Sequence, residues 1–145
     1  MSIYFLLFWS SLILVSLAAY RWGGTPEKAV AAMYLLAAVA TVVVHPATTV
    51  RYRNVEMGVF LIDACLLAGL CVVSVRADRW WPLCATALQL LTVLSHVGKA
   101  VNPGLWRYGY QLMAVWAAWP TVGLLALGVW RHHRRTRRTA DTSLG

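Results

Sequence analysis

The chain has 145 residues, of which 60% are hydrophobic and only 12% are charged, and its formal net charge is +8. A soluble domain has roughly 25% charged residues, and a soluble fold of this length could not bury so much apolar surface. The 13 Lys and Arg residues lie at the ends of apolar runs or in the last 15 residues. This distribution is typical of membrane-topology signals. The composition therefore predicts a one-domain membrane protein whose partner is the lipid bilayer and not nucleic acid.

Two apolar runs occupy the first third of the chain. Residues 2–20 carry no charge and are long enough to cross the ~30 Å hydrocarbon layer as a helix. A cleaved signal peptide would have a positive segment before its apolar core, whereas here Arg21 follows the run. We therefore expect a retained first span. The turn RWGGTPEK (21–28) separates it from a second span at 29–45, with Thr25 as the expected N-cap.

The rest of the chain predicts further spans and a polar tail. Residues 46–56 are the most polar internal segment and are expected to form a loop. Three more spans are expected at residues 57–75, 82–98 and 110–130. The last segment, RHHRRTRRTADTSLG (131–145), has no apolar periodicity and is expected to be a disordered basic tail, with His132 and His133 in solvent.

The positions of the basic residues predict the orientation of the bundle. Lys and Arg are enriched in cytoplasmic loops. With the N-terminus outside, the cytoplasmic segments hold nine Lys and Arg residues and the outer segments hold four. The nine are Arg21, Lys28, Arg76, Arg79, Arg131, Arg134, Arg135, Arg137 and Arg138, and the four are Arg51, Arg53, Lys99 and Arg107. We therefore expect an all-α integral membrane bundle of five transmembrane helices with a cytoplasmic C-terminus. Removal of the first run would leave four spans and the same C-terminal side.

The third and fourth runs contain polar side chains at membrane depth. An Asp at the centre of a span costs roughly 2.5–3.5 kcal/mol on insertion scales, so Asp63 is expected to face protein or water. The fourth run carries a polar stripe at steps of three and four, which is one face of a helix: Thr86, Gln89, Thr92, His96 and Lys99. A short turn makes these two helices antiparallel neighbours. We therefore predict that Asp63 turns toward Gln89 and His96, flanked by Glu56 and His45 in the outer half.

Three uses of this intramembrane cluster are open from the sequence. The first is an interhelical clamp that fixes helix register, since such hydrogen bonds contribute about 0.6 kcal/mol each on average. The second is a proton- or ion-coupled site in which Asp63 titrates beside His96. The third is a haem b or quinone site, with His45 and His96 as the axial haem ligands. Outside this third use, we expect no cofactor and no metal.

The sequence contains no Walker loop, HExxH, CxxCH or GxSxG pattern. The stretches RYRNVEMGVFLIDACLLAG, RADRWWPL and LQLLTVLSHVGKAVNP resemble small multi-pass proteins of the bacterial inner membrane over residues 51–130. The resemblance implies that membrane and brings no activity or functional residue with it. We therefore expect a non-enzymatic structural or accessory component, in contact with other membrane subunits and, through its basic tail, with anionic lipids. The alternative is a small transport or redox module that uses Asp63 and His96.

Overall fold

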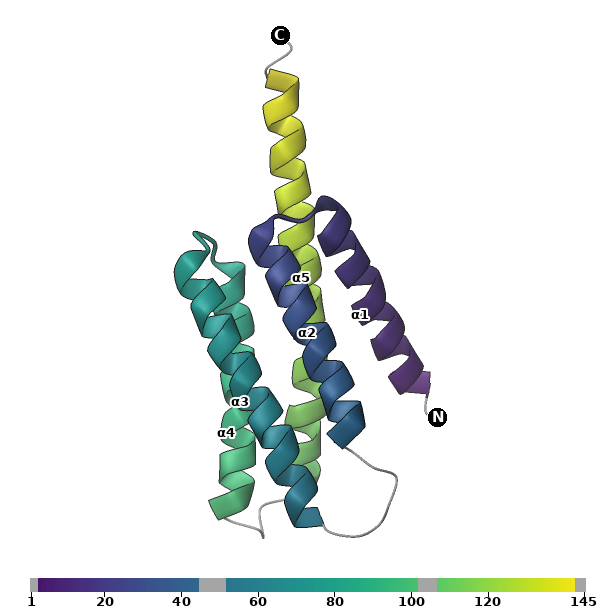
Figure 1. Ribbon diagram of the computed structural model, residues 1–145, viewed down its shortest axis with the longest axis vertical. Helices are drawn as coiled ribbons and strands as arrows, with labels where there is room; N and C mark the ends of the chain where they lie inside the picture. The colour runs from purple at the N-terminus through teal and green to yellow at the C-terminus, as the bar shows by residue number, and fades with distance from the viewer. Residues whose placement is uncertain (1–2, 45–51, 102–106, 143–145) are drawn as a thin grey trace.

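The computed structural model of the protein is a bundle of α-helices (Figure 1). It describes residues 3–44, 52–101 and 107–142. Within these ranges there are five helices: α1 (Ile3–Trp22), α2 (Thr25–Val44), α3 (Tyr52–Arg76), α4 (Trp81–Val101) and α5 (Arg107–Thr142). The predicted all-α class is confirmed, and four of the helices, α1 to α4, are long and apolar enough to cross a membrane.

The helices extend beyond the apolar runs that predict them. Residues 52–56, expected in a loop, form the first turns of α3, and α2 begins at Thr25 instead of residue 29. Polarity marks where the hydrocarbon layer ends, whereas a helix ends where its backbone hydrogen bonds or its caps stop it. Residues 45–51, which include His45, lie outside the described residues.

Each helix contacts the ones before and after it along the chain, and α5, which lies behind α2 in Figure 1, also contacts both α1 and α2. Short connections join α1 to α2 and α3 to α4, which makes these pairs antiparallel. The apolar core draws on all five helices: Leu12, Ala19, Val30, Ala31, Tyr34, Leu70, Trp81, Val122, Leu125 and Val129. Large apolar side chains also cover the outside of the bundle, such as Leu14, Leu36 and Leu83. This is the surface that a bilayer would cover.

α5 continues as a helix through Thr142, where the sequence analysis expects a disordered tail from residue 131. Extending an existing helix needs no new nucleus, and Arg is a good helix former. The hydroxyls of Thr136 and Thr139 donate to carbonyls one turn earlier, those of His132 and Arg135. The extension projects past the bundle at the end that holds the α1–α2 and α3–α4 turns (Figure 1).

Trp81 fixes the distance between α4 and α5 at this end. Its side chain is only 2% exposed and is the largest fully buried one among the described residues. The indole lies against Gly128 of α5, where an added Cβ would come within 2.7 Å of Trp81 Cε2. Glycine at this position therefore permits the close approach of the two helices.

Gly128→Ala is expected to destabilise the bundle by about 1–3 kcal/mol, because the indole must move to make room for a methyl group. Gly123→Ala, on the same helix, is the matched control, since nothing lies within 4 Å of its added Cβ. That variant should be neutral or slightly stabilising. The free energy of unfolding, measured by denaturant titration in detergent, distinguishes the two. Equal values would contradict the packing described for Trp81.

Candidate functional site

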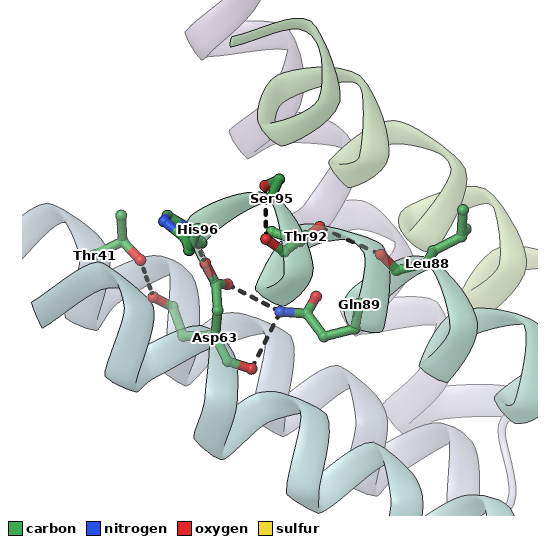
Figure 2. Close-up of polar contacts among 8 residues, drawn as sticks. Thr41, Asp63, Leu88, Gln89, Thr92, Ser95 and His96 are labelled. Atoms are coloured by element: carbon green, nitrogen blue, oxygen red, sulfur yellow. Dashed lines mark hydrogen bonds and ion pairs between the residues drawn. The ribbon is translucent and has the colours of Figure 1, made fainter. Parts of the chain in front are cut away.

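The Asp63 carboxylate lies between two side chains of α4 (Figure 2). Gln89 Nε2 donates to Asp63 Oδ1 at 2.9 Å and to the Asp63 carbonyl oxygen at 3.3 Å. His96 Nε2 lies 3.0 Å from Asp63 Oδ2. The side chains of His96 and Asp63 are 7% and 19% exposed, so the cluster is mostly buried in the bundle. The predicted contacts of Asp63 with Gln89 and His96 are thereby confirmed.

The spacing of residues along the two helices explains this meeting. Gln89 and His96 are seven residues apart, so both lie on one face of α4. The same face carries Thr86, whose Oγ1 lies 2.8 Å from Ser74 Oγ of α3. Because Thr86 donates its proton to the Pro82 carbonyl, Ser74 is the donor in this pair. Polar contacts therefore follow the seam between α3 and α4 over several turns and fix its register.

The cluster has the chemistry of an acid–base pair held by an amide. Asp63 accepts one side-chain hydrogen bond at each carboxylate oxygen. The imidazole can make its contact either as a neutral donor at Nε2 or as a cation. The geometry therefore suits a register-fixing clamp, and it also suits proton exchange between Asp63 and His96.

The remaining predicted residues are not part of the observed contacts. Glu56 belongs to α3, but its side chain is not among those described, and His45 lies outside the described residues. The pair His45 and His96 as haem ligands therefore stays a prediction. In this structure Nε2 of His96 is engaged with Asp63.

Removing the carboxylate should measure the strength of the clamp. Asp63→Ala leaves the amide of Gln89, which is 6% exposed, without its side-chain acceptor, and should cost about 1–2 kcal/mol of unfolding free energy. A double-mutant cycle with Gln89→Ala should give a coupling energy of about 0.6–1.7 kcal/mol. The measurement is an unfolding titration of the four proteins in one detergent. Strictly additive effects would show that the hydrogen bond does not stabilise the bundle.

A second polar cluster, which the sequence analysis missed, lies where the α1–α2 turn, the α3–α4 turn and α5 meet. Glu27 is fully buried, with 0% of its surface exposed. Its Oε1 forms an ion pair with Arg79 Nη1, and its Oε2 accepts from the backbone N–H of Gly24 at 3.0 Å. Arg79 Nη2 donates to His132 Nδ1 at 3.0 Å. One buried carboxylate therefore connects three parts of the chain.

The position of Glu27 follows from the start of α2. Lys28 N–H donates to the Gly24 carbonyl, which makes Gly24 the N-cap in place of the expected Thr25. Glu27 then occupies the third helical position, from which a Glu side chain reaches back to the N-cap N–H as in a capping box. A Glu three residues after a possible cap was the signal in the sequence that could have identified this contact.

The prediction that His132 and His133 lie in solvent holds only in part, since both side chains are half-buried and contact other parts of the bundle. His132 accepts the hydrogen bond from Arg79, and the His133 ring lies 5.9 Å from that of Trp22, centroid to centroid. The reason is the continuation of α5, which holds both imidazoles beside the two turns instead of releasing them into a mobile tail.

Replacing Arg79 should lower the free energy of unfolding more than replacing Glu27. Arg79→Leu leaves the Glu27 carboxylate buried without its cation, which should cost about 3–5 kcal/mol. Glu27→Gln should cost less, because the Arg79 side chain is 23% exposed and can still reach water. Arg76→Leu, at the exposed last residue of α3, is the control and should leave stability almost unchanged. If unfolding titrations find Arg79→Leu as stable as Arg76→Leu, a structural role for the ion pair is contradicted.

Comparison of the chain with protein-family models, with curated proteins and with solved structures gave no match. The fold and the two clusters define a multi-pass helical membrane protein with paired ionisable groups inside it.

Proposed function

We propose that this chain is a five-span protein of the bacterial inner membrane, with its N-terminus outside and its C-terminus in the cytoplasm. Residues 110–130 of α5 are almost entirely apolar, and Val122, Leu125 and Val129 are buried in the bundle, which supports a fifth span. The excess of Lys and Arg at the end of the bundle that carries Arg79 and the α5 extension supports a cytoplasmic location for that end.

Within that membrane, the protein acts as a non-enzymatic structural or accessory component of a larger assembly. The observation that supports this role is that both carboxylate oxygens of Asp63 bind side chains of the same bundle, those of Gln89 and His96. The partners are themselves buried, so the polar atoms are used to hold α3 against α4. Glu27 is held in the same way at the other end. The outer surface that remains is rich in large apolar side chains, which lipid or neighbouring subunits would cover.

A second function is favoured by one specific observation. The Asp63 side chain is 19% exposed beside His96, so the carboxylate is not fully enclosed by the bundle. A small proton- or ion-coupled transporter would use this pair as its titrating site. The two functions differ in whether Asp63 must change its protonation state.

Extraction of the tagged full-length chain from its native membrane into polymer nanodiscs tests the accessory role. Native mass spectrometry should find the chain in a complex with other membrane subunits at fixed stoichiometry. Asp63→Asn should remain in that complex, because the amide keeps the size of the side chain and an acceptor for Gln89. Recovery of the chain only as a monomer or as copies of itself would contradict the accessory role.

The same protein, purified and reconstituted into liposomes, distinguishes the two functions. Under an imposed pH gradient, wild type and Asp63→Asn vesicles should both lose the gradient at the rate of protein-free vesicles. A faster decay with the wild type that disappears in Asp63→Asn would instead support the proton-coupled function.

A further inference from the structure

A pocket with a volume of about 640 Å³ opens between the α3–α4 turn and α5. Its lining includes four arginines: Arg76, Arg79, Arg131 and Arg135. The pocket adjoins the Glu27 ion pair through Arg79 and lies about 20 Å along α3 from Asp63, at 1.5 Å per residue. It is therefore separate from the intramembrane cluster.

The charges on the wall of the pocket favour an anion. The positive charge of Arg79 is paired with Glu27, so Arg76, Arg131 and Arg135 supply three further positive charges. Asp78, also on the wall, supplies one negative charge. The guanidinium group offers a planar set of donors that matches the oxygens of a phosphate and can bind two of them at once. The pocket is thus suited to a phosphate group.

Two tryptophans, Trp80 and Trp81, also line the pocket, and Trp80 holds one of its arginines in place. The guanidinium carbon of Arg131 lies 5.5 Å from the ring centroid of Trp80, a cation–π contact that holds the arginine at the pocket. The Nε1 of Trp81 is buried and has no hydrogen-bond partner in the part of the chain that the structure describes. This N–H lies against Gly128 of α5 and has no accessible surface, so it is not among the groups that would contact a bound anion.

The apolar part of the lining distinguishes a lipid from a soluble anion. Val75 and Leu83 also line the pocket, and they are 88% and 58% exposed. Their side chains continue the outer apolar surface of α3 and α4, which a bilayer would cover. A ligand with a phosphate head and acyl chains would fit both parts of this wall.

The α5 extension would collect such ligands near the pocket. Arg131, Arg134, Arg135 and Arg138 follow the spacing i, i+3, i+4 and i+7, so they share one face of the helix. Two of these four line the pocket. Basic residues near an anionic membrane surface attract lipid headgroups by about 1 kcal/mol each.

We propose that this pocket binds the headgroup phosphate of an anionic phospholipid, with Arg76, Arg131 and Arg135 as its ligands. The site does not depend on the role of Asp63, and the proposed orientation decides only that the lipid comes from the cytoplasmic leaflet. Binding there would bring the α3–α4 turn and α5 together over one bound anion.

The test uses the purified full-length chain in micelles that contain neutral phosphatidylcholine, titrated with phosphatidylglycerol and followed by native mass spectrometry. Arg131→Gln/Arg135→Gln should weaken phosphatidylglycerol binding roughly 10- to 30-fold, from the contribution of each basic residue. The matched control is Arg21→Gln/Lys28→Gln, which removes the same charge from exposed positions at the same end of the bundle, outside the pocket. At physiological salt it should change the affinity by less than about threefold.

Three results would overturn the proposal. One is an equal loss of affinity in both double variants, since this would indicate diffuse attraction to the basic end of the bundle. Another is wild-type binding with no preference for phosphatidylglycerol over phosphatidylcholine. The third is unchanged affinity in Arg76→Gln, a variant on α3 that keeps the test valid if the α5 variants fold poorly.

A competition arm separates the two sources of a phosphate group. Glycerol phosphate carries the headgroup phosphate without acyl chains, so it should displace the bound lipid only weakly at millimolar concentration. Efficient displacement at micromolar concentration would overturn the lipid assignment and identify a soluble phosphate ester as the ligand.

Discussion

The arrangement of this bundle depends on the satisfaction of two carboxylates that the fold withdraws from water. A hydrocarbon layer offers no hydrogen-bonding partner, so a polar group placed in it must find one within the protein. Asp63 does so through Gln89 and His96 of the antiparallel neighbour, and this fixes which face of α4 turns toward α3. Glu27 does so through Arg79 and Gly24, and this fixes how the α1–α2 and α3–α4 turns meet.

The two clusters act on different parts of the fold. The contacts of Asp63 lie within one helix pair and set its register. Those of Glu27 join elements that are far apart in the sequence: Arg79 follows Glu27 by 52 residues, and His132 follows Arg79 by 53. Apolar packing alone is poorly directional in a membrane, since lipid and leucine offer similar contacts. The polar contacts therefore supply much of the specificity of the arrangement.

The contacts of Asp63 were predictable because the alternatives were few. A carboxylate in an apolar helix, beside an antiparallel helix with one polar stripe, can reach only that stripe. The cluster around Glu27 was not predicted because the residue lies in a polar turn, where water is the ordinary partner. Its burial depends on how three segments come together, and hydrophobic periodicity does not contain that information. The helical state of residues 131–142 was missed for a related reason, since composition ignores the helix to which the segment is attached.

The single helix that runs from the bundle to Thr142 has a mechanical consequence. The part beyond Trp130 is a rod of about 18 Å, at 1.5 Å per residue, with no break at its base. A tilt of the part of α5 that packs in the bundle would therefore be transmitted along the rod to the arginines at its far end. Small rearrangements inside the bundle would become larger displacements of positive charge beyond it.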